Sequence, residues 1–248
     1  MSVSKWRWKE ICDTRPCPGD CDLCGYEDEM IYIIMCGGKY HNWQKPRQLT
    51  EVNSEPLIVR TVRLLKENGI EPYISSNDPI FEEFAPVLYH SNRYEGYKNG
   101  GNNGRWTDCF YPTDQPACYI FGDVLFSPEA IKTIVETPTD DIEFFASAEP
   151  FAVNYPKPWA EPFAFKVACQ GHLKSAIAQT ETLASRGAFK RAPIAWELWQ
   201  VIKGTPLNRI IKNYTTINDY TCDVDSPEDL KRIEQNVPHT VSYEEICK

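Results

Sequence analysis

Short apolar runs alternate along this chain with segments of helical periodicity, and this alternation constrains the fold more than any other feature. The first run, MIYIIMC at residues 30–36, is rich in isoleucine, as is typical of a strand covered on both faces. Residues 56–69 carry apolar side chains at helical spacing, and residues 71–77 have the composition of a second strand. Strand, loop, helix and strand in this order form the unit of a parallel sheet, so we predict an α/β fold.

The same alternation continues to the end of the chain. We predict further strands at residues 117–123, 141–148 and 161–169, and further helices at residues 127–136, 171–185, 193–203 and 226–235. One domain with a mostly parallel sheet is expected over residues 30–248. Residues 1–29 have no periodicity and are predicted to form a cysteine-rich amino-terminal extension. Glycines and asparagines cluster in residues 91–116, which predicts a long loop or lid.

Charge and apolar content exclude several classes of protein. The net charge is −9, whereas a protein that holds duplex nucleic acid by neutralising phosphates needs a basic face. No stretch reaches the roughly 18 apolar residues of a membrane span, and the amino terminus has no apolar signal segment. We therefore expect a cytoplasmic protein that binds neither nucleic acid nor membranes. The sequence leaves homo-oligomerisation open.

Four of the ten cysteines cluster near the amino terminus, at Cys12, Cys17, Cys21 and Cys24. Four thiolates this close together could hold a tetrahedral zinc ion. Their spacing leaves three interpretations open: a structural zinc site, reduced free thiols, or an iron–sulfur cluster. The other six cysteines are scattered, several of them within apolar runs, and are expected to pack in the core.

Residues suited to phosphate chemistry follow directly after predicted strands. Gly37 and Gly38 end the first strand and let the backbone approach a phosphate closely, and Arg47 adds positive charge nearby. Asp123 and Asp225 follow two later apolar segments. In doubly wound sheets ligands bind beyond the carboxyl ends of the strands, and Mg²⁺ prefers one or two carboxylates with phosphate oxygens. Together these residues predict a magnesium and triphosphate site, although each alone is more often a turn, a cap or a solvated charge.

These motifs resemble those of the GT-A type nucleotidyltransferases, which include sugar-phosphate nucleotidylyltransferases, the cytidylyltransferase of isoprenoid synthesis and the molybdenum-cofactor guanylyltransferase. PRQL at residues 46–49 is similar to the family's Pro-Lys-x-Leu element, with arginine in place of lysine. EPLI at residues 55–58 is similar to its Gly-Lys-Pro-Leu-Ile helix start. FGDVLFSPEAI and DVDSPEDL are similar to its Gly-Asp and Asp-x-Asp segments. The resemblance covers residues 30–235 and implies a three-layer, Rossmann-like GT-A fold.

The resemblance also implies a reaction, in which a nucleoside monophosphate passes from a nucleoside triphosphate to a phosphorylated small molecule with release of pyrophosphate. Mg²⁺ would be held by Asp123 and Asp225, and the catalytic cations would be Lys39, Arg47 and Lys166. A snorkelling or exposed strand lysine is the alternative interpretation of Lys166. The residues implied to contact the nucleotide are Met35, Cys36, Gly37, Gly38, Lys39, Arg47 and Gly122.

One departure from the family keeps other functions open. The family's glycine loop usually continues with Ser/Thr-Arg, whereas GGKYHNW offers Lys39 and His41. Either one of these has taken over phosphate binding or the triphosphate is held more weakly, and His41 is equally explained as a solvated loop residue. The alternatives are a GT-A glycosyltransferase that uses a nucleotide sugar, with DVD as its metal motif, and a non-catalytic nucleotide-binding module. DVD precedes the final predicted helix, which favours the nucleotidyltransferase.

Overall fold

The central sheet has seven strands and follows the alternation seen in the sequence. The computed structural model describes residues 29–37, 45–90, 106–148, 160–207, 213–226, 229–231 and 233. Across the sheet the strands are β10 (Thr215–Ile217), β8 (Ile142–Ser147), β9 (Pro162–Val167), β6 (Ala117–Phe121), β1 (Ile31–Met35), β4 (Tyr73–Ser76) and β5 (Val87–Tyr89). β9 is antiparallel to its neighbours β6 and β8, and the other neighbouring pairs are parallel. The predicted mostly parallel α/β sheet is confirmed.

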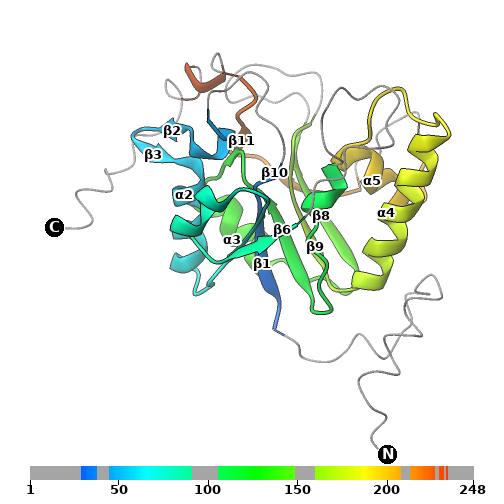
Figure 1. Cartoon of the computed structure of the whole chain (residues 1–248), viewed down its shortest axis with the longest axis horizontal. Helices are drawn as coiled ribbons and strands as arrows, with labels where there is room; N and C mark the ends of the chain where they lie inside the picture. The colour runs from blue at the N-terminus through cyan, green and yellow to red at the C-terminus, as the bar shows by residue number, and fades with distance from the viewer. Residues whose placement is uncertain are drawn as a thin grey trace, which may run out of the picture.

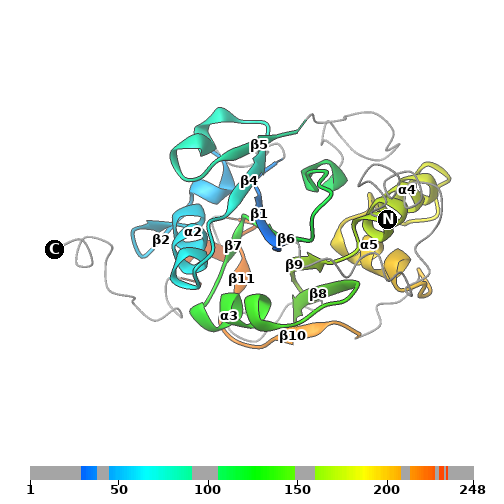
Figure 2. The ribbon, with the colours of Figure 1, turned by 90° about the horizontal axis from the view of Figure 1, so that it is seen from below.

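Helices cover both faces of this sheet (Figures 1 and 2). α2 (Leu57–Glu67) and α3 (Pro128–Glu136) lie on one face, and α4 (Gln170–Ser185) and α5 (Ala195–Ile202) lie on the other. Ser127 caps α3, because its hydroxyl accepts a hydrogen bond from the N–H of Ala130. Ser226 likewise accepts from the N–H of Asp229 (3.1 Å), as predicted for the start of the last helix. The chain therefore has the three layers expected of it.

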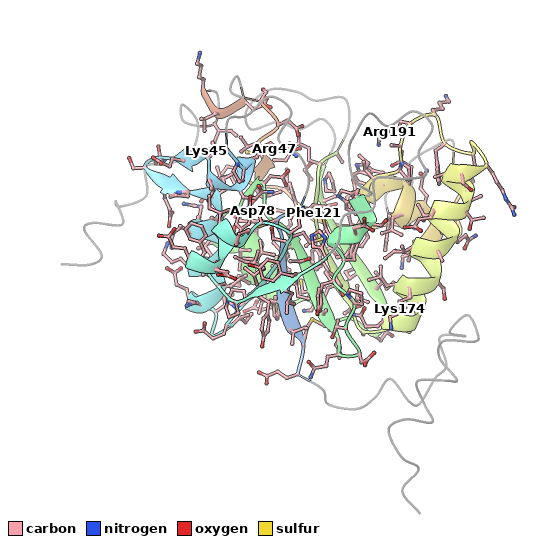
Figure 3. All side chains as sticks on the ribbon, in the orientation of Figure 1. Lys45, Arg47, Asp78, Phe121, Lys174 and Arg191 are labelled. Atoms are coloured by element: carbon pink, nitrogen blue, oxygen red, sulfur yellow. The ribbon has the colours of Figure 1, made fainter. Side chains whose placement is uncertain are left out.

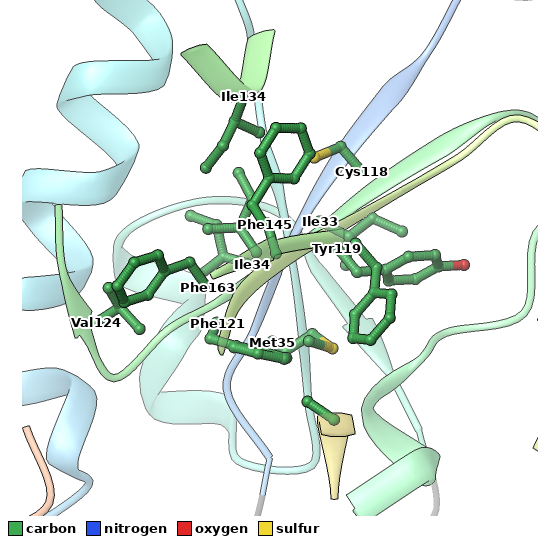
Figure 4. Close-up of a cluster of buried hydrophobic side chains, with 14 of the residues drawn as sticks. Ile33, Ile34, Met35, Cys118, Tyr119, Phe121, Val124, Ile134, Phe145 and Phe163 are labelled. Atoms are coloured by element: carbon green, nitrogen blue, oxygen red, sulfur yellow. The ribbon is translucent and has the colours of Figure 1, made fainter. Parts of the chain in front are cut away.

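The core lies on both sides of the central strands. Ile33 and Ile34 of β1 are completely buried, and Figure 4 shows them among the other apolar side chains of the sheet. On the side of α5, Trp196 and Trp199 pack against Phe144 with ring centroids 5.1 and 5.3 Å apart. Aromatic rings of this size bury a large apolar area and contribute much of the core's stability. The five scattered cysteines that the structure describes are buried, as predicted, and form no disulfide bonds with one another.

A short antiparallel ladder lies beyond the end of β6. It consists of β7 (Val124–Leu125) and β11 (Cys222–Asp223). The strand predicted to end at Gly122 and Asp123 is β6, which ends at Phe121, and β7 pairs with a different part of the chain. A second short ladder joins β2 (Glu51–Val52) and β3 (Glu55–Pro56) just before α2.

Two predicted segments lie outside the described residues. They are the amino-terminal extension up to residue 28, with its four clustered cysteines, and residues 91–105 of the predicted lid. The remainder of that lid begins with a 3₁₀ helix, η3 (Trp106–Cys109). Within the part of the chain that the structure describes, every helix is too short or too polar to span a membrane.

Candidate active site

Two carboxylates from distant parts of the chain meet beyond the carboxyl end of β6. Asp123 lies two residues after β6, and Asp225 lies two residues after β11. The ladder of β7 and β11 brings them together, because Asp223 pairs with Val124. In addition, the N–H of Val224 donates to the backbone oxygen of Asp123 (3.0 Å). The two residues predicted as metal ligands are thus placed at one edge of the sheet.

Arg47 links these two carboxylates. Its Nη2 lies 2.8 Å from Oδ2 of Asp123, and its Nη1 lies 2.9 Å from Oδ1 of Asp225. Arg47 opens the 3₁₀ helix η1 (Arg47–Leu49), which directly follows Pro46. Figure 3 shows Arg47 and Lys45 at the edge of the molecule where the parallel strands end. Three of the predicted site residues, Arg47, Asp123 and Asp225, are therefore in direct contact.

The electrostatics of this cluster fix the charge of its arginine. The pKa of Arg47 is raised above its ordinary value chiefly by Asp123, with further contributions from Asp225 and Asp223, while burial opposes the shift. The guanidinium is therefore charged at every physiological pH. One positive charge faces three carboxylates, so the cluster keeps a negative balance that favours a further cation.

The donor atoms of the cluster fit Mg²⁺. This ion takes carboxylate oxygens together with phosphate oxygens and water, and both Asp123 and Asp225 already converge on a cation, the guanidinium of Arg47. Among the described residues no group of three or more His, Cys, Asp or Glu side chains could hold a metal ion on its own. Phosphate oxygens or water would therefore complete the coordination.

A buried acid supports the backbone of this edge. Glu161, which is 1% exposed and directly precedes β9, accepts a hydrogen bond from the N–H of Asp223 (3.1 Å). The N–H of Glu161 in turn donates to the hydroxyl of Ser147 (2.8 Å). Glu161 therefore holds the strand that leads to Asp225. Nothing in the sequence points to this role of Glu161, because an acidic residue before a strand carries no signal of its own.

Met35 and Cys36 bring backbone, and not side chains, to this end of β1. Their side chains are buried in the core, and burial raises the pKa of the Cys36 thiol. The N–H of Cys36 donates to the backbone oxygen of Ser75 (2.8 Å), and its own oxygen accepts from the hydroxyl of Ser76 (3.0 Å). The side chains of both residues are thus turned away from a nucleotide, and the expected contact of Met35 and Cys36 with it stays a prediction for their backbone. Gly38 and Lys39 lie outside the described residues, so their predicted roles stay predictions.

Close packing requires glycine at the end of β6. The N–H of Gly122 donates to the backbone oxygen of Met35 (3.1 Å). A Cβ added at Gly122 would lie 2.7 Å from this oxygen and 2.6 Å from Sγ of Cys36. Gly37 at the end of β1 is equally enclosed, because its Cβ would lie 2.5 Å from Sγ of Cys109. Both glycines bring backbone, without side chains, to the edge where Asp123 lies.

Gly122→Ala is expected to lower the free energy of unfolding by about 1–3 kcal/mol, as overpacking does in a close-packed site. The methyl group would displace the Met35 carbonyl and shift Asp123, so activity per folded molecule should fall as well. Urea unfolding followed by tryptophan fluorescence measures the loss. Adding Cys36→Ala should restore part of it, because one of the two clashes disappears. An unchanged unfolding midpoint for Gly122→Ala would contradict this account.

Lys166 lies at the other end of the sheet. Within β9 it pairs with Cys118 at the start of β6, whereas Asp123 follows the end of that strand. Its Nζ donates to three carbonyl groups at the end of α3, those of Ile134 (3.1 Å), Val135 (2.8 Å) and Thr137 (2.5 Å). The structure therefore corrects the prediction that Lys166 is a catalytic cation. Of the alternative, a snorkelling or exposed lysine, only the exposed form is wrong, because 6% of the residue is exposed.

Lys166→Met is expected to lower the free energy of unfolding by about 1.5–3 kcal/mol, the range for hydrogen bonds to a charged group. Methionine keeps most of the unbranched side chain but leaves the last carbonyls of α3 without their donor. Lys132→Met is the control, since Lys132 lies exposed on the same helix in an i,i+4 pair with Glu136. Urea titrations of the two variants should differ; equal midpoints would show that the buried ammonium stabilises nothing.

Several solved structures have the same fold as this chain. No family model matches the chain, and no curated protein matches its sequence. The chain is similar in structure to a Bacillus anthracis protein assigned as a glucose-1-phosphate thymidylyltransferase, with 14% identity, a TM-score of 0.52 and coverage of 86% of this chain and 97% of that one. It is similar also to the inositol-1-phosphate CTP transferase from T. maritima, with 14% identity, a TM-score of 0.50 and coverage of 85% and 99%.

A third similar structure is the bifunctional IspDF from Campylobacter jejuni, with 11% identity and a TM-score of 0.52. This match covers 82% of the chain and 54% of the bifunctional protein. At such identities the likeness shows the fold alone. The chain has the fold of these nucleotidyltransferases, which confirms the three-layer α/β architecture implied by the sequence motifs.

Proposed function

We propose that this chain is a Mg²⁺-dependent nucleotidyltransferase that transfers a nucleoside monophosphate from a nucleoside triphosphate to a sugar phosphate or similar phosphorylated small molecule. The observation that carries the proposal is the meeting of Asp123 and Asp225 on the guanidinium of Arg47, at the ligand-binding edge of the sheet. The fold shared with a thymidylyltransferase and a CTP transferase supports the same class of reaction.

In the proposed reaction an oxygen of the acceptor's phosphate attacks the α-phosphorus of the triphosphate. The bond between the α-phosphorus and the bridging oxygen breaks, and pyrophosphate leaves with the electron pair. Such a transfer depends on positioning and on neutralising charge. Mg²⁺ bound by Asp123 and Asp225 would supply part of that neutralisation. The fork of Arg47 suits the departing pyrophosphate, and Lys39 is the second cation of the proposal.

The setting of the reaction is part of the proposal. The five described cysteines form no disulfide bonds with one another, as is usual in a reducing compartment, so we assign the protein to the cytoplasm. The net charge of −9 agrees with small phosphorylated substrates, which need only a local cationic group such as Arg47, and not with a nucleic-acid partner.

The test is pyrophosphate release from each of the four common nucleoside triphosphates, with Mg²⁺ and a panel of sugar phosphates. We expect release with one triphosphate and one acceptor, and its loss when EDTA removes the metal. A parallel arm with nucleotide sugars and sugar acceptors measures transfer of the sugar. Silence in the first arm with transfer in the second would replace the proposal by the glycosyltransferase, and silence in both arms would favour a non-catalytic module.

A further inference from the structure

The guanidinium of Arg47 occupies the place between the two carboxylates that a bridging cation would take. It contacts Oδ2 of Asp123 and Oδ1 of Asp225 through two different nitrogens, at 2.8 and 2.9 Å. We propose that Arg47 acts as a built-in substitute for the metal, and that Mg²⁺ enters only when a nucleotide draws the guanidinium onto its phosphates. This inference rests on the proposed function and adds an order of binding to it.

The exchange follows from the chemistry of the two cations. Hydrated Mg²⁺ gives up its water reluctantly, so the metal alone competes poorly with a guanidinium already hydrogen-bonded to both aspartates. A triphosphate changes the balance in two ways. Its oxygens supply the ligands that complete the metal's coordination, and they offer Arg47 a bidentate partner in place of the carboxylates.

The side chain of Arg47 has access to such a ligand. It is 32% exposed, and Asp225 beside it is 55% exposed, so phosphates could reach the outer side of the guanidinium. Asp223 adds negative charge next to Arg47, and its N–H donates to the buried carboxylate of Glu161. The backbone beneath the aspartates is thus fixed while the arginine is free to change partner.

The substitution that distinguishes this chain explains why it can behave in this way. The similar motif of the GT-A type nucleotidyltransferases has lysine where this chain has Arg47. An ammonium group is a single point of charge, whereas a guanidinium presents separate nitrogens in a fixed plane and can hold two carboxylates at once. We therefore expect that only arginine at this position can bridge the two carboxylates in place of the metal.

The experiment is a Mn²⁺ titration in the absence of nucleotide, with free Mn²⁺ measured by electron paramagnetic resonance. Arg47→Gln is expected to bind Mn²⁺ at least about tenfold more tightly than the wild type, because the two carboxylates lose their competing cation. Arg63→Gln is the matched control. Arg63 lies on α2 and pairs with Glu55 and Glu67, so this variant should bind Mn²⁺ as tightly as the wild type does. Adding Asp123→Asn to Arg47→Gln should abolish the gain.

Equal or weaker Mn²⁺ binding by Arg47→Gln would overturn the inference, and would mean that metal and arginine use different oxygens of the same aspartates. Arg47→Lys serves if the glutamine variant does not fold; it should bind Mn²⁺ more tightly than the wild type, and equal affinity would again overturn the inference. Pyrophosphate release is scored separately on the wild type. If the wild type released no pyrophosphate while Arg47→Gln bound Mn²⁺ more tightly, the proposed transferase activity would be wrong. The competition between Arg47 and the metal would still be supported.

Discussion

Asp123→Asn is expected to reduce pyrophosphate release on the order of 10³-fold, the scale on which losing one stabilising group at a reacting phosphate is felt. The amide keeps the shape of the side chain but removes one of the two charges that would hold the metal. Arg47 would stay at the edge of the sheet through its contact with Asp225 (2.9 Å). Steady-state rates with the best triphosphate and acceptor, measured over a range of Mg²⁺ concentrations, check the prediction.

Asp114→Asn provides the matched control for this experiment. Asp114 is exposed, precedes β6 and lies 3.8 Å from Lys174, which Figure 3 places at the opposite edge of the molecule from Arg47. Its loss should leave the rate within about twofold of the wild type, since surface pairs contribute little. If Asp123→Asn and Asp114→Asn had similar rates, the carboxylate after β6 would not be a metal ligand and the proposed function would lose its central residue.

The strands of this fold could be predicted because a strand that is buried on both faces consists almost entirely of apolar residues. β1 and β6 are apolar throughout, and the strand-ending glycine at position 122 placed Asp123 at the carboxyl edge correctly. The direction of β9 could not be predicted in the same way. A buried strand has the same apolar pattern whether its neighbours are parallel or antiparallel, so PFAFKV carries no record of its reversal.

The contacts of the site were predicted less fully than its residues. Arg47 and Asp225 are 178 residues apart, and a basic residue after a glycine loop predicts charge but not its partner. The role of Lys166 was predicted wrongly for a related reason. A lysine in a predicted strand suggests either exposure or a catalytic role, but the carbonyl groups at the end of α3 offered a third solution that only tertiary packing could reveal.

Arg60→Met is expected to lower the free energy of unfolding by about 3 kcal/mol or more, because removing one partner of a buried ion pair leaves its other groups without compensation. Arg60 on α2 is 3% exposed. Its Nε donates to the backbone oxygen of Phe126 (2.7 Å), Nη1 to Glu55 (3.3 Å) and Nη2 to the hydroxyl of Tyr220 (3.0 Å). One side chain thus joins α2 to the residue that follows β7 and to the segment that leads into β11.

Arg63→Met is the control that separates burial from charge. Arg63 pairs with the same Glu55 (2.8 Å), but its side chain is 22% exposed, so its loss should cost about 1 kcal/mol or less. Urea unfolding followed by tryptophan fluorescence measures both variants, and Arg60→Lys, which keeps the charge but not the fork, should fall between them. Because Tyr220 lies two residues before β11, Arg60→Met should also weaken Mn²⁺ binding to the Arg47→Gln variant. Equal unfolding midpoints for Arg60→Met and Arg63→Met would show that the buried network does not hold the strand that carries Asp225.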